Sequence, residues 1–191
     1  MERLGKVTLF MSALILCAIL SISSKSISAT AGSNVDSDSY LKNNRTSKNG
    51  MYGYILSNDK SRACIIDYYG STDIKELIIP DMIDGYPVIS IGGEGSISIE
   101  SYPFGGFDDK DPLSYIPYSL FNRCDNLEEI KLPKQLEWIG AGAFSGTKVK
   151  KVVLPDTVTY IGASAFASCY QLDEVILSKN IEIIERYAFE F

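Results

Sequence analysis

The 191-residue chain contains no histidine. This absence removes the imidazole that activates the nucleophile in Ser-His-Asp and Cys-His enzymes, and it also removes the ligands of an HExxH zinc site. No spacing of carboxylates, and no Ser-Lys pair, singles out another catalytic arrangement. We therefore expect a protein that is not an enzyme and that has no cofactor and no metal site.

A surplus of basic residues is also absent. Lys and Arg number 18 against 24 Asp and Glu, which gives a net charge of −6. A protein that binds nucleic acid needs a basic surface to neutralise phosphates. The sequence therefore predicts no nucleic-acid partner.

Cysteine is scarce, and there is no C-x-x-C spacing. Cys17 lies in an N-terminal apolar run, which leaves Cys64, Cys124 and Cys169 in the body of the chain. This number is odd, whereas the disulfide framework of a small secreted domain is normally even and denser. Cys124 and Cys169 occupy the same place in two of the repeats described below, so we expect buried, unpaired thiols.

Long hydrophobic runs are absent apart from one near the N-terminus. Two basic residues precede an apolar run over about 7–22, and an A-x-A sequence follows at 29–31. These are the parts of a secretory signal peptide, and the run is shorter than the ~20 residues of a membrane span. The sequence predicts a signal peptide over 1–31, a polar linker over 32–50, and a secreted or cell-surface chain without a membrane span.

The second half of the chain repeats itself. Phenylalanine recurs at Phe121, Phe144, Phe166 and Phe189, at spacings of 23, 22 and 23 residues. Leu, Ile and Val follow the same register, as in LPKQLEWIGAGAF and LPDTVTYIGASAF. A period of about 20–29 residues is typical of leucine-rich repeats, in which stacked coils bury one shared core. We therefore expect the four phenylalanines to line up along one axis.

Each repeat has the parts of one coil. In NLEEIKLP, the apolar residues on either side of Lys131 indicate a short strand with one buried face. Pro133 ends that strand because proline has no N–H for the ladder. Gly140 and Gly162 are expected to supply a backbone conformation that other residues resist. The Ala-Phe pair that follows is expected in a short helical or 3-10 turn.

These residues closely resemble the BspA-like leucine-rich repeat family of bacterial surface proteins, whose coils read roughly L-x-x-I-x-(I/L)-P-x-x-V-x-x-I-G-x-x-A-F-x-x-C. LEEIKLPKQLEWIGAGAF and LDEVILSKNIEIIERYAF match this pattern, and residues 52–92 look like the usual opening of such a domain. The resemblance implies a right-handed, β-dominated solenoid of 22–23-residue coils over 51–191. It also implies surface adhesion, or contact with a host matrix or surface protein.

One stretch departs from the family pattern. After Ile91-Gly92 the Ala-Phe turn does not follow, and an insertion at about 93–112, GEGSISIESYPFGGFDDKDP, precedes the next repeat. It is either a binding loop, with Tyr102, Phe104 and Phe107 as candidates, or a longer and structurally idle coil. Its acidic DDKD lacks EF-hand spacing, so it predicts no calcium site.

Two columns of the repeat are candidates for binding. Ile78, Val153 and Ile176 occupy, with Lys131, strand positions that alternate with the core and should face outward. A row of exposed apolar residues suggests an interaction surface. The alternative is that these β-branched residues are there only because they favour the β-strand conformation.

The second column is aromatic. Beside Ile116, Ile139 and Ile161 stand Tyr115, Trp138 and Tyr160. Such a row can hold a protein or a sugar, or it can pack sideways between coils.

The sequence as a whole favours a secreted or surface-exposed, non-enzymatic module that binds a protein through its open sheet and the insertion, with a glycan as a possible ligand. The alternative is a targeting or carbohydrate-binding N-terminal module of a larger secreted enzyme.

Overall fold

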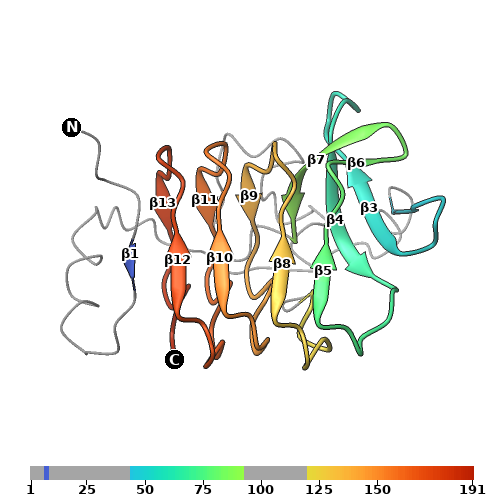
Figure 1. The fold of residues 1–191 in the computed structure, drawn as a ribbon. Coiled ribbons are helices and arrows are strands. Elements are labelled where there is room, and N and C mark those ends of the chain that lie inside the picture. The colour runs from blue at the N-terminus through green and yellow to red at the C-terminus, as the bar shows by residue number, and fades with distance from the viewer. Residues whose placement is uncertain (1–6, 9–43, 93–119) are drawn as a thin grey trace, which may run out of the picture.

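The computed structural model describes residues 7–8, 44–92 and 120–191. Every regular element in these residues is a β-strand (Figure 1). The described part of the chain accordingly contains no helix of the length and hydrophobicity needed to cross a membrane. The predicted insertion at 93–112, with Tyr102, Phe104 and Phe107, lies outside the described residues, and so do Tyr115 and most of 1–50.

One short strand from each coil forms the first sheet, sheet A, which faces the viewer in Figure 1. Its parallel strands are β5 (Glu76–Ile78), β8 (Glu129–Lys131), β10 (Lys151–Val153) and β12 (Glu174–Ile176). The strands are parallel because each coil brings the chain back to the same starting edge. The N-terminal strand β1 (Val7–Thr8) pairs antiparallel with β12.

A second strand from each coil forms sheet B. Its parallel strands are β7 (Tyr86–Ile91), β9 (Trp138–Ile139), β11 (Tyr160–Ile161) and β13 (Ile183–Ile184). Strand β6 (Met82–Ile83) forms a hairpin with β7. Sheet B continues beyond β7 through β4 (Ala63–Tyr68), β3 (Tyr52–Leu56) and β2 (Arg45–Thr46). Strand β2 falls within the stretch that the sequence predicts as a polar linker.

In both sheets the order of the coil strands follows their order in the chain, as expected for leucine-rich repeats stacked on one another. The right-handed sense of the winding stays a prediction.

The core between the two sheets is built on a stack of phenylalanine rings. The ring centroids of Phe121 and Phe144 lie 5.1 Å apart, those of Phe144 and Phe166 5.3 Å, and those of Phe166 and Phe189 5.4 Å. Neighbouring rings are tilted by 14°, 10° and 2°. Tyr68 lies at the N-terminal end of the stack, with its ring centroid 5.3 Å from that of Phe121 and its plane tilted by 58°. The predicted alignment of the four phenylalanines is therefore confirmed.

The helical or 3-10 turn predicted at each Ala-Phe pair is wrong for the described residues, which form hydrogen-bonded turns there. The N–H groups of Gly142, Phe144 and Gly146 point to the next coil instead of back along their own chain, with bonds of 2.8 to 2.9 Å. Their acceptors are the carbonyl oxygens of Ala163, Ala165 and Ala167. Positive φ angles of 62° at Gly142 and 77° at Gly146 interrupt any helix. We call these coil-to-coil bonds the corner ladder.

The role predicted for Gly140 and Gly162 is also wrong. Neither has a positive φ, and the left-handed conformation occurs two residues later, at Gly142 and Ser164, with φ angles of 62° and 56°. Gly162 is needed for a different reason, because a Cβ atom there would lie 2.6 Å from the backbone nitrogen of Ala141. The glycine therefore lets adjacent coils approach closely.

The repeat register contains one further difference. The sequence places Ile116 in the column of Ile139, but the residue paired with Ile139 on the N-terminal side is Ile91. In the same way Ser90 pairs with Trp138, at the place where the aromatic column predicts Tyr115. Strand β7 therefore occupies the place directly before β9, where the sequence register predicts residues 115–116.

Candidate binding surface

Strand alternation divides each strand of sheet A between the core and the outside. The middle residues point inward, and Leu77, Val152 and Val175 are buried in the core. The flanking residues form two rows on the outer face. The charged row is Glu76, Glu129, Lys151 and Glu174, and the apolar row is Ile78, Lys131, Val153 and Ile176.

The apolar row contains three residues that the sequence singles out. Ile78 is 57% exposed and Val153 is 51% exposed, while Ile176 is half-buried. The structure places all three in one row on one face, with Val153 and Ile176 paired directly. Covering apolar surface of this kind with a partner is favourable by roughly 25 cal/mol per Å².

Lys131 lies in the apolar row, but its ammonium group points to the charged row. Its Nζ atom lies 2.5 Å from Oε1 of Glu76 in the charged row. The hydrogen bond and the charge of Glu76 raise the pKa of Lys131 above its usual value. Because the ammonium group is turned toward the charged row, the aliphatic stem of Lys131 can extend the apolar row between Ile78 and Val153.

Further ion pairs join neighbouring coils within the charged row and beside it. Lys151 Nζ lies 2.8 Å from Oε2 of Glu174. Glu128 accepts from Lys150 and lies 3.3 Å from Lys75 Nζ, and these lysines, Lys150 first, lower the pKa of its carboxyl group. Exposed pairs add little stability, but they fix the register between coils and give the face a defined charge pattern.

The aromatic residues Trp138 and Tyr160 lie on a different surface. They occupy the face of sheet B that points away from the phenylalanine core, with ring centroids 5.0 Å apart. Their exposed fractions are 7% and 2%. They belong to a buried group, which we call the outer cluster: Ile55, Cys64, Ile66, Ile89, Trp138 and Tyr160. The structure thus separates the sequence-predicted aromatic residues from the apolar row.

The three described cysteines are buried. Cys124 and Cys169 take equivalent places in their coils, where each N–H donates to the carbonyl of the preceding Phe. Thr147 occupies the intermediate coil, with its Oγ1 atom 3.4 Å from the Cys169 sulfur. Burial raises the pKa of both the Cys124 and the Cys169 thiol, so these groups serve packing.

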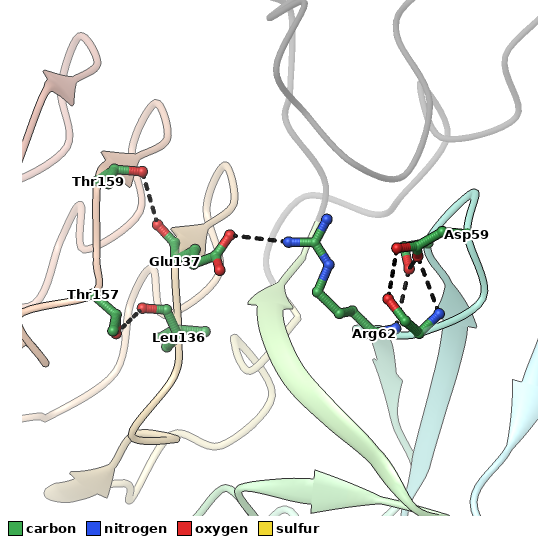
Figure 2. A network of polar contacts seen from close by, with 8 residues as sticks. Asp59, Arg62, Leu136, Glu137, Thr157 and Thr159 are labelled. Atoms are coloured by element: carbon green, nitrogen blue, oxygen red, sulfur yellow. Dashed lines mark hydrogen bonds and ion pairs between the residues drawn. The ribbon is translucent and has the colours of Figure 1, made fainter.

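A polar network that the sequence did not predict joins the β3–β4 hairpin to the coils, as Figure 2 shows. The Arg62 guanidinium lies 3.5 Å from the Glu137 carboxylate. Thr157 donates to the carbonyl of Leu136 at 2.7 Å, and Thr159 donates to the carbonyl of Glu137 at 3.5 Å. The two threonine bonds join residues 21 and 22 positions apart, which is about one repeat. The repeat period is therefore the feature of the sequence from which these bonds could have been predicted.

At the hairpin end of this network, hydrogen bonds to Asp59 hold the turn between β3 and β4. Asp59 accepts hydrogen bonds from Ser57 and Ser61, which lower the pKa of its carboxyl group to about 2. These bonds fix the turn between β3 and β4, from which Arg62 reaches the coils (Figure 2).

Comparisons with known proteins agree with the repeat. A family model described as the BspA type leucine rich repeat region matches residues 97–191 in six copies. No curated protein sequence matches the chain.

Two solved structures are similar. A leucine-rich repeat protein from T. pallidum (TpLRR) is 23% identical, with a TM-score of 0.34, over 67% of this chain and 69% of that chain. A leucine-rich repeat protein from Bacteroides ovatus ATCC 8483 is 22% identical, with a TM-score of 0.33, over 66% of this chain and 40% of that chain.

The family match spans the four stacked phenylalanines, the corner ladder and the strands from β8 to β13. Residues 97–191 belong to the BspA-type leucine-rich repeat family.

Proposed function

We propose that this chain is a secreted or cell-surface, non-enzymatic module that binds another protein through the outer face of sheet A. The observation that supports the proposal is the apolar row beside the charged row, with Ile78 and Val153 each more than half exposed. Exposed apolar residues that lie next to one another on a protein surface often mark an interaction site.

The face is suited to binding because it is already ordered. Its strands are backed by buried Leu77, Val152 and Val175, so little backbone freedom is lost when a partner docks. The apolar row would supply burial, and the ion-paired charged row would orient the partner.

The size of the face sets the expected affinity. Four three-residue strands about 4.8 Å apart cover roughly 15 by 10 Å, on the order of 150 Å², which is small against the ~800 Å² that a stable partner buries on each side. We therefore expect modest affinity per chain, raised by many copies displayed on one cell surface.

The proposed partner is a host matrix or surface protein, which follows from the family resemblance. The two rows contain no aromatic ring on which a sugar could stack. For that reason we place a protein partner ahead of a glycan.

The test compares binding of the exported chain with that of its Ile78→Glu and Val153→Glu variants, by surface plasmon resonance against purified matrix proteins and on a glycan array. A buried carboxylate is costly, so each variant should bind a recognised protein at least about tenfold more weakly. Tyr170→Glu, at an exposed site outside both rows, is the matched control and should bind normally. Unchanged binding by both row variants, or binding to glycans alone, contradicts the proposal.

A further inference from the structure

Glu129 differs from the other members of the charged row in its ion pairing. Glu76 is bound by Lys131, with Nζ and Oε1 2.5 Å apart. Lys151 and Glu174 bind each other, with Nζ and Oε2 2.8 Å apart. Glu129 is exposed and lies beside Glu76 and Lys151 in the sheet. Among the described residues, however, no cation lies within salt-bridge distance of its carboxylate.

The lysines around Glu129 are held by other carboxylates. On the strands of its own coil and the next, Lys131 binds Glu76 and Lys150 binds Glu128. Glu76 first, and then the more distant charge of Glu129, raise the pKa of Lys131, so Glu129 acts on this lysine through space without a hydrogen bond. The carboxylate of Glu129 therefore relies on solvent for most of its stabilisation.

The position of Glu129 places this carboxylate beside the apolar row. Glu129 and Lys131 lie two residues apart on β8 and face the same side, about 7 Å apart. Lys131 stands between Ile78 and Val153, which are 57% and 51% exposed. A partner that covers this part of the apolar row therefore also removes water from Glu129. Burying a carboxylate is unfavourable unless an opposite charge compensates it.

We propose that Glu129 is a specificity-determining residue, which selects protein partners that place an arginine beside apolar side chains. This inference rests on the proposed function, in which a protein docks on the outer face of sheet A. An arginine fits because its planar guanidinium donates two hydrogen bonds to one carboxylate and is less strongly hydrated than an ammonium group.

The spacing of the partner's residues follows from β8. In an extended partner segment, the arginine and the nearest apolar residue are two positions apart, as Glu129 and Lys131 are. A neutral or acidic segment of the same shape covers the apolar row equally well but leaves Glu129 without a counter-charge. The apolar row thus supplies contact area, and Glu129 discriminates between partners.

The test selects peptides from a random library displayed on phage, in parallel on the exported chain and on its Glu129→Lys variant. The wild type should enrich peptides with an arginine two positions from Ile, Leu, Val or Phe. Glu129→Lys should enrich Asp or Glu at that place instead. Glu182→Lys is the matched control, because it changes the net charge equally at an exposed glutamate beside β13 of sheet B. It should select the same peptides as the wild type.

A conservative variant measures the size of the effect on one enriched peptide. Glu129→Gln keeps the shape of the side chain and should weaken binding by about two- to fivefold, the range of an exposed charge pair. The affinity of Glu129→Gln should also fall less steeply with added salt than that of the wild type, because the screened interaction is gone. Circular dichroism checks that each variant is folded.

The Ile78→Glu variant separates this inference from the proposed function. If Ile78→Glu abolishes enrichment while Glu129→Lys selects the same peptides as the wild type, the inference is overturned and the proposed function stands. If neither variant changes the selection, both are contradicted. An arginine preference that Glu182→Lys also abolishes would overturn the inference, because net charge would then be its cause. Failure of the wild type to enrich any peptide would overturn it as well.

Discussion

At the residue scale, one backbone position decides how each coil turns its corner. Gly142, Ser164 and Tyr187 occupy this position in successive coils, with φ angles of 62°, 56° and 61°. This left-handed conformation is less stable by about 1–2 kcal/mol for a residue that has a Cβ atom. Serine and tyrosine adopt it because the corner ladder on either side fixes the backbone.

This position gives a stability prediction. Ser164→Gly should stabilise the protein by about 0.5–1 kcal/mol, because the relief of left-handed strain exceeds the loss of chain entropy. Gly142→Ala should destabilise it by about 1 kcal/mol or more for the converse reason. Urea unfolding followed by circular dichroism measures both changes. Equal stability of both variants with the wild type would mean that the corner tolerates any residue.

Tyr52 gives a prediction for alkaline pH. Burial, and then the neighbouring Tyr68, raise the pKa of Tyr52 from 10 to about 12. Because the folded pKa is above the unfolded one, the folded protein holds this proton more tightly, and the resulting stability is complete below pH 10 and lost as the pH rises toward 12.

The free energy of unfolding of the wild type should therefore fall more steeply between about pH 10 and 12 than that of Tyr52→Phe. Urea titrations at a series of pH values supply the two slopes. Identical slopes would show that Tyr52 ionises equally in both states.

The residue scale also separates what the sequence could reveal from what it could not. The phenylalanine stack followed from spacing alone, because equal spacing in a stacked repeat gives equal positions. The left-handed position could not be predicted from the sequence. Gly140 and Gly142 are both glycine, and the equivalent position in the next coil is Ser164, so no residue type marks the left-handed conformation consistently. A backbone angle is visible in sequence only where glycine is used consistently.

At the scale of the element, a coil stacked on both sides differs from one stacked on a single side. Phe144 is fully buried between two rings, whereas Phe189 is half-buried with one ring neighbour. The same side chain therefore stabilises the protein by different amounts in the two places.

Phe144→Ala should cost about 3–5 kcal/mol, because it leaves a cavity in the middle of the stack. Phe189→Ala, the matched change at the last ring, should cost clearly less. Chemical denaturation of both variants tests the difference, and an equal loss would indicate that coils do not rely on both neighbours.

The strands also show where pattern analysis fails. The alternation around Lys131 correctly predicted a strand with one buried face, and the column of Ile78, Val153 and Ile176 correctly faces outward. The assignment of Ile116 to the column of Ile139 was wrong. When an insertion is nearly as long as one repeat, the apolar pattern of the sequence is the same whether the insertion is placed before or after a repeat. Pairing of Ile91 with Ile139 decides the register, and pairing is not a local property.

For the whole molecule, stability is expected to grow with the number of coils, since each coil adds an interface to its neighbour. Duplicating residues 144–165, one complete 22-residue period, should raise the midpoint of thermal unfolding. Inserting the same residues in scrambled order serves as the control and should lower it. A lower midpoint for the true duplication would mean that the coils are not interchangeable.

The corner ladder gives the stack a direction. Gly142, Phe144 and Gly146 all donate toward the later coil, and Ser164, Phe166 and Ser168 do the same one step on. Each unit thus presents donors forward and acceptors backward, so a copied unit fits in one orientation and a reversed one cannot. Each additional coil encoded by the gene lengthens the outer face of sheet A by about 4.8 Å. The length of the face can therefore change while the kind of side chains on it stays the same.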